Sequence, residues 1–191
     1  MKKITALAVS LFLLTNISAQ KLSGKISQLK GQEEVNVVID FSNIKVNGKT
    51  EAKFLEDETA KKTEEERIKW YQEWNEDMKS SAHSLFIREF NKHSTENTFS
   101  VGDFENTEYT IIVKIVEINT GFFGGPFARP SLINADVKFV KTGETEAFAT
   151  IKCPKSSSAL SSTVPYFVTR IAMSVGKVGE IAAKTVGKDL K

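Results

Sequence analysis

The chain has few of the residues on which covalent and metal chemistry depend. It contains one cysteine and two histidines among 191 residues. A lone cysteine cannot form an internal disulfide, so the fold has to be stabilised by packing alone. His83 and His93 show no HExxH, paired-His or Cys–His spacing, and no glycine-rich loop precedes a helix to hold a phosphate. We therefore expect no metal and no cofactor.

Recognisable catalytic motifs are also lacking. Cys153 is followed by Pro154 at the end of a strand-like run, and neither histidine lies near it in the sequence. A nucleophilic thiol needs a neighbouring base or positive charge to lower its pKa. We expect Cys153 to be a small buried apolar residue, and we expect no catalytic residues and no enzyme activity.

The longest apolar run, Ile4 to Leu14, is too short to span a bilayer, which needs about 20 residues. Lys2 and Lys3 precede this run, and a polar stretch ending in Ala19 follows it. This order predicts a secretory signal peptide over residues 1–19 and a mature chain that begins at Gln20. Because a lipoprotein needs cysteine at that position, we expect a periplasmic or secreted protein with no lipid anchor and no transmembrane segment after cleavage.

Charge of one sign does not dominate the chain. It has 26 basic and 24 acidic residues, and removal of Lys2 and Lys3 makes the two numbers equal. A nucleic-acid-binding protein would need clustered positive charge to displace counterions from phosphates. The sequence therefore argues against a nucleic-acid partner. The length and the hydrophobic content of 40% suit one globular domain, predicted over residues 34–191.

The amino-terminal part of this chain is predicted to contain a polar loop followed by a strand. Residues 20–33 are polar and predict a flexible lead-in. Residues 35–41 are rich in valine and isoleucine and nearly continuously apolar, which predicts a strand buried on both faces. Asn47-Gly48 indicates a turn. The charged residues 56–62 have the composition of a solvated connector.

Two long helices are predicted. Thr63 followed by Glu66 has the capping-box pattern of a helix start, and apolar residues recur at three- and four-residue spacing as far as His93. We interpret the aromatic members of this stripe as core. A second helix should begin near Ser161, with small residues at helical spacing that include Gly176 and Gly179. Glycine costs about 1 kcal/mol relative to alanine within a helix, so we expect another backbone close to these positions.

Strands fill the region between the helices. An alternating pattern predicts a short strand at 98–102, a longer one at 108–118, and strands at 131–141 and 145–153, the last pair joined by a tight hairpin at 141–144. The predicted fold class is an α/β two-layer sandwich with a mixed, mostly antiparallel sheet of about five strands and two long helices.

The loop between the second and third of these strands is unusual. Phe122, Phe123 and Phe127 stand among glycines and prolines, where loop residues are normally exposed. Either the rings fold back onto the sheet, or they form a binding surface for a partner with Arg129 as an orienting charge. An alternative site lies where the first strand ends, at Asp40 and Ser42. We expect Asp40 to be a turn or cap carboxylate there, and a catalytic base or cation ligand is the alternative.

Several short motifs resemble a group of uncharacterised secreted proteins of Bacteroidetes-type bacteria. They are residues 37–42 with Gly48, residues 109–113, Arg129-Pro130, Asp136-Val137 and residues 141–144 before the closing helix. The element order is similar to the amino-terminal domain of TolB and to lipoprotein activators of peptidoglycan synthases. This resemblance implies a cell-envelope protein that binds other proteins or itself. The expected function is therefore a non-enzymatic binding module, with a small-ligand binder or enzyme near Asp40 and Ser42 as the alternative.

Overall fold

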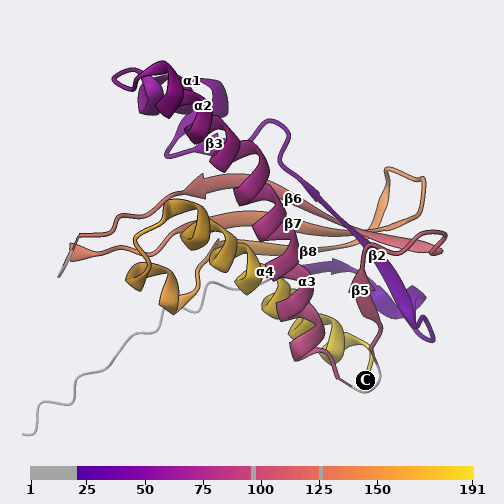
Figure 1. Ribbon diagram of the computed structural model, residues 1–191. Coiled ribbons are helices and arrows are strands. Elements are labelled where there is room, and N and C mark those ends of the chain that lie inside the picture. The colour runs from indigo at the N-terminus through magenta and orange to yellow at the C-terminus, as the bar shows by residue number, and fades with distance from the viewer. Residues whose placement is uncertain (1–20, 96–97, 125–126) are drawn as a thin grey trace, which may run out of the picture.

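A mixed β-sheet lies behind two long helices (Figure 1). The computed structural model describes residues 21–95, 98–124 and 127–191, so the predicted signal peptide and Gln20 lie outside the described residues. The main strand order is β1-β8-β7-β6-β2-β5. The α/β class and the mixed sheet are confirmed. Among the described residues the sheet contains eight strands, more than the five expected, because the three unpredicted strands have only two to four residues and show no alternating pattern. The described residues also form more helices than the two expected.

The centre of the sheet is antiparallel. Strands β6 (Tyr109–Asn119), β7 (Leu132–Lys141) and β8 (Ala147–Ser156) follow one another through hairpins. Gly143 adopts a φ of 87° in the β7–β8 turn, which suits a residue without a side chain. The predicted hairpin at 141–144 is therefore confirmed.

Strand β2 (Glu34–Asp40) adds the parallel part of the sheet, pairing with β6 on one side and with β5 (Ser100–Gly102) on the other. Val35 and Val37 are buried, whereas Val38 is exposed. Burial of this strand on both faces was the wrong expectation, because helices cover only one face of the sheet (Figure 1). The short strands β3 (Lys45–Val46) and β4 (Lys49–Thr50) form a hairpin beside β6 through the predicted turn at Asn47-Gly48.

Residues 21–29 differ from the flexible lead-in expected of them. Strand β1 (Lys21–Gly24) pairs with β8, and a 3-10 turn, η1 (Ile26–Leu29), follows it. Ile26 and Leu29 are fully buried, and the Ile26 amide donates to the Asp189 carboxylate over 3.1 Å. Two apolar side chains in a polar stretch are enough to hold it on the core.

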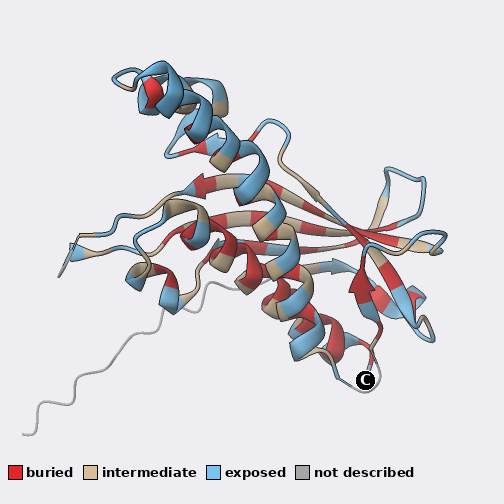
Figure 2. Cartoon of the chain, viewed as in Figure 1, coloured by how far each residue is buried: buried red, intermediate tan, exposed pale blue. Residues whose placement is uncertain are grey.

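The first long helix begins as predicted. In α2 (Glu64–Gln72) the Thr63 hydroxyl accepts from the Glu66 amide at 3.3 Å, and the Glu66 carboxylate accepts from the Thr63 amide at 2.8 Å. A π-helical turn, η2 (Glu73–Met78), leads directly into α3 (Lys79–His93). The residues expected to form a connector instead belong largely to a short helix, α1 (Glu51–Thr59). Figure 2 shows the α1 and α2 end mostly exposed.

The second long helix, α4 (Phe167–Asp189), follows a 3-10 turn, η4 (Ala159–Thr163), and packs against both α3 and the sheet. A Cβ atom placed on Gly179 would lie 2.5 Å from the carbonyl oxygen of Phe86. The close backbone approach that the small residues predicted is therefore present, and α3 is the neighbouring element. The core between helices and sheet is apolar, and its largest fully buried side chains are Trp74, Phe86, Phe90, Phe99 and Phe139.

Candidate functional site

The aromatic loop extends beyond the hairpin of β6 and β7. Phe122, Phe123 and Phe127 have 57%, 44% and 78% of their surface exposed, and Arg129 is exposed as well. Residues 125 and 126 lie outside the described residues. Of the two interpretations of this loop, the structure has the one in which the rings remain on the surface.

The base of the loop is held by backbone hydrogen bonds. The Phe122 amide donates to the Arg129 carbonyl at 3.0 Å, and the Arg129 amide donates to the Phe122 carbonyl at 2.7 Å. Gly121 adopts a φ of 67°, and a Cβ atom there would lie within 2.7 Å of the backbone of Arg129 and Pro130. The loop therefore continues the hairpin, and its rings project from an ordered base.

Arg170, in the first turns of α4, connects this base to the chain that precedes α4. Its Nε donates to the carbonyl of Thr120 at 3.2 Å, and its Nη1 donates to the carbonyls of Val164 at 3.0 Å and Pro165 at 2.6 Å. Arg170 is 5% exposed. Tyr166, which directly follows Pro165, is 74% exposed. We call Phe122, Phe123, Phe127 and Tyr166 the aromatic end of the molecule.

The alternative site has the geometry of a turn. One Asp40 carboxylate oxygen accepts from the Ser42 amide at 2.7 Å, and the other pairs with Lys114 Nζ at 2.9 Å. Partial burial would raise the pKa of Asp40, but the hydrogen bonds from Ser42 and Lys114 outweigh it and lower the pKa from 3.8. Neither Asp40 nor Ser42 lines any of the five best-defined hollows among the described residues. Asp40 is thus the turn carboxylate that the sequence predicted.

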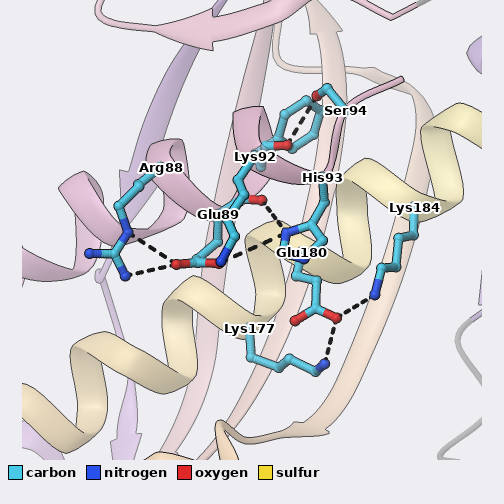
Figure 3. A network of polar contacts seen from close by, with 9 residues as sticks. Arg88, Glu89, Lys92, His93, Ser94, Lys177, Glu180 and Lys184 are labelled. Carbon is cyan, nitrogen blue, oxygen red and sulfur yellow. Dashed lines mark hydrogen bonds and ion pairs between the residues drawn. The ribbon is translucent and has the colours of Figure 1, made fainter. Parts of the chain in front are cut away.

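A charged network lies over the contact between α3 and α4 (Figure 3). Arg88 donates to Glu89 at 2.7 Å, and Lys177 and Lys184 pair with Glu180 at 2.8 and 2.5 Å. Burial raises the pKa of Glu180, but the two lysines outweigh it and lower the pKa to about 2. A hollow of about 270 Å³ lies beside these residues. Every ion pair of the network joins residues of one helix, so we interpret these contacts as stabilising α3 and α4 individually along the face where they meet.

The remaining reactive side chains are held in structural contacts. Cys153 is buried, and burial raises its pKa to about 12, so it is the small buried residue that the sequence predicted. His83 lies 3.1 Å from Asp103, and His93 Nδ1 lies 2.9 Å from the Glu89 carbonyl. Within residues 21–95, 98–124 and 127–191, no group of three or more His, Cys, Asp or Glu side chains is placed to hold a metal ion. Nor does any helix in these ranges have the length and apolar character to cross a membrane.

Comparison with known proteins adds little to this geometry. No family model and no curated protein matches the chain. Among solved structures, a PelC dodecamer from Paraburkholderia phytofirmans is similar over 84% of this chain and 96% of that chain, with 13% identity and a TM-score of 0.37. A second crystal form, of a PelC variant with one substitution, has the same identity and coverage and a TM-score of 0.36. At these TM-scores the likeness does not place the chain in that family.

Sequence reasoning selected Phe122, Phe123, Phe127 and Arg129 as candidates, and the structure places all four at the same hairpin end. It missed Arg170 and Tyr166. Arg170 is 50 residues from Thr120, and no pattern in the sequence relates the two. One signal was available, because Arg170 is a lone cation in a stretch otherwise free of charge.

Proposed function

We propose that this protein is a non-enzymatic binding module that contacts another protein through its aromatic end and Arg129. The observation that carries the proposal is the exposure of three phenylalanine rings on an ordered hairpin end. Together they present roughly 300 Å² of aromatic surface to solvent. Exposed apolar patches of this order on soluble proteins are often functional.

The energy available from this surface is sufficient for a specific contact. At about 25 cal/mol per Å², covering it would contribute roughly 7 kcal/mol as an upper bound. Loss of rotational and translational freedom and ordering of side chains reduce that figure substantially. The base of the loop is already hydrogen-bonded between Phe122 and Arg129, so ordering this base adds nothing to the reduction. The surface therefore suits a partner of moderate affinity.

Support for a binding module also comes from the alternative site. The carboxylate of Asp40 is engaged by Ser42 and Lys114, and Asp40 lies outside the five best-defined hollows of the described residues. No observation favours an enzyme or small-ligand binder at Asp40 and Ser42.

We place this contact in the cell envelope, with the protein periplasmic or secreted. The support is the predicted signal peptide and the resemblance to secreted envelope proteins of Bacteroidetes-type bacteria. The partner in this proposal is an envelope protein, and self-association through the same rings is the variant of it that the experiment also detects.

Photo-crosslinking from the aromatic end tests the proposal. Benzoylphenylalanine would replace Phe127 in one variant and Ile68 in another, because Ile68 is another largely exposed apolar residue, on α2. After irradiation of envelope preparations, we expect a discrete crosslinked product from position 127 and none from position 68. Mass spectrometry then distinguishes a second copy of the chain from a different protein.

Replacement of the rings provides the matching loss experiment. A variant with Phe122, Phe123 and Phe127 changed to Ser should keep its circular-dichroism spectrum and thermal midpoint and lose the crosslinked partner in pull-downs. A folded triple variant that still captures the same partner would show that the contact surface lies elsewhere.

A further inference from the structure

Arg170 is a buried cation without a carboxylate partner. Only 5% of it is exposed, and its three observed hydrogen bonds all go to backbone carbonyls. No ion pair joins it to any of the described residues, and burial alone lowers its pKa from the usual value. Breaking or omitting the counter-ion of a buried charge generally costs several kcal/mol. A buried arginine is therefore normally paired with a carboxylate, and the lack of one beside Arg170 indicates where a carboxylate from outside the chain could bind.

The surroundings add further uncompensated positive potential. Helix α4 has 23 residues, no side chain caps its amino-terminus, and its first turn contains no acidic residue. Such a terminus carries about half a positive elementary charge. The Arg170 guanidinium lies beside it, because Nη1 bonds the carbonyls of Val164 and Pro165 just before the N-cap Tyr166. Two positive features therefore lie together where a carboxylate is expected.

The two neighbouring segments supply no carboxylate either. Residues 118–135, which include the aromatic loop, contain no Asp or Glu and one cation, Arg129. Residues 156–176, which precede and begin α4, contain no Asp or Glu and one cation, Arg170. The remaining terminal nitrogen of Arg170, Nη2, makes no hydrogen bond to the described residues, and it is open to solvent, because no enclosed side-chain nitrogen of these residues lacks a partner. A carboxylate brought by a partner can therefore reach it.

We propose that Arg170 and the amino-terminus of α4 bind a carboxylate of the protein partner, in an acidic segment whose apolar side chains contact the aromatic end. This inference rests on the proposed function, and it specifies the chemistry of the partner. Guanidinium groups and helix amino-termini both favour carboxylates, and these hydrogen bonds are about twice as strong as neutral ones. Arg170 bonds the carbonyls of Thr120 and Pro165. Phe122 lies two residues after the first of these, and Tyr166 directly follows the second. Apolar and anionic recognition therefore meet at one place.

An anionic lipid surface is the other class of ligand with negative charge. Proteins that bind such surfaces by charge present clusters of about 4–8 lysines and arginines. Each of the two segments here has one arginine, and one of these is buried. A carboxylate-bearing protein segment fits this arrangement better than a membrane does.

The experiment uses phenylacetate as a probe that combines an aromatic ring with a carboxylate, and phenylacetamide as its neutral counterpart. Each is titrated into the ¹⁵N-labelled full chain. We expect phenylacetate to shift the backbone amides of Val168 and Thr169 and the Nε–H of Arg170 saturably. Phenylacetamide should bind at least tenfold more weakly. This comparison needs no variant, so it does not depend on Arg170 variants folding.

Two variants sharpen the assignment. Arg170→Gln removes the charge and should abolish the phenylacetate response, provided that its amide spectrum remains dispersed. Arg88→Gln removes an exposed arginine of α3 and should leave the affinity within twofold. Equal binding of phenylacetate and phenylacetamide, or saturation at amides elsewhere, would overturn the inference.

Vesicles distinguish the lipid alternative. We expect the chain not to co-sediment with phosphatidylglycerol vesicles beyond its level with phosphatidylcholine vesicles. Strong co-sedimentation that phenylacetate does not reduce would overturn the inference in favour of a membrane. Crosslinking from position 127 without a phenylacetate response would overturn the carboxylate site alone. A phenylacetate response without crosslinking would contradict the proposed protein contact instead.

Discussion

Phenylalanine occupies two contrasting settings in this protein. On α3, Phe86 and Phe90 are fully buried, with ring centroids 6.1 Å apart. In the β6–β7 loop, Phe122 and Phe127 are largely exposed. The first pair lies at helical spacing on a stripe that α4 and the sheet cover. The second pair stands beyond the ends of the strands, where no element covers it. The position of a ring relative to the layers, more than its type, determines whether it stabilises the fold or remains available to a partner.

The same contrast applies to positive charge. Lys177 and Lys184 each pair with Glu180 on the outside of the helix layer. Arg170, near the other end of the same helix, has only carbonyl acceptors. These two lysines of α4 have a carboxylate partner, and Arg170 has none among the described residues.

The sharpest test of this comparison is a pair of truncations. Phe86→Ala removes a fully buried ring and should lower the free energy of unfolding by about 3–5 kcal/mol through lost burial and a cavity. Phe127→Ala removes an exposed ring and should change it by less than about 0.5 kcal/mol. Urea denaturation followed by circular dichroism measures both. Similar losses in the two variants would mean that the loop ring is part of the core.

A smaller effect is expected from the close contact of α3 and α4. Gly179→Ala places a Cβ atom 2.5 Å from the Phe86 carbonyl oxygen, so one helix has to move. We expect a destabilisation of about 1–3 kcal/mol from this overpacking. At Gly176 the nearest atom is the Glu89 Cγ at 3.2 Å, on a flexible side chain. Gly176→Ala should therefore be tolerated within about 1 kcal/mol, aided by better helix propensity. Thermal unfolding of the two variants makes the comparison, and the idea fails if Gly176→Ala is the more damaging.

The smallest effect concerns Glu180 and depends on pH. The pKa of Glu180 is lowered from 4.5 to about 2, so its interaction with the lysines stabilises the fold above pH 4.5 and is lost as the pH falls through about 2. Because the lysines are partly exposed, we expect Glu180→Gln to cost about 1 kcal/mol at pH 7. The difference from wild type should shrink below pH 4.5 and disappear below about pH 2. Glu56→Gln, at an exposed position on α1, is the control. A pH-independent difference for Glu180→Gln would exclude this charge effect.

The sequence predicted elements whose signals are local or periodic. Thr63 and Glu66 marked the start of α2, residues 141–144 marked a hairpin, and Gly179 marked a close helix contact. These signals work because capping, turn formation and helix packing depend on residues a few positions apart. Strand β1 and helix α1 were missed, because each is short and has a polar composition without a clear period.

What the sequence by itself determined is the class of the fold and the unusual composition of the β6–β7 loop. Both follow from periodicity and from the backbone preferences of glycine and proline, which act locally. Only the tertiary structure decided that the rings stay exposed, that Asp40 is engaged in a turn, and that Arg170 lies beside the loop base. The contact between Arg170 and Thr120 joins residues 50 positions apart. Such a contact depends on how α4 packs against the sheet, and no local pattern encodes that packing.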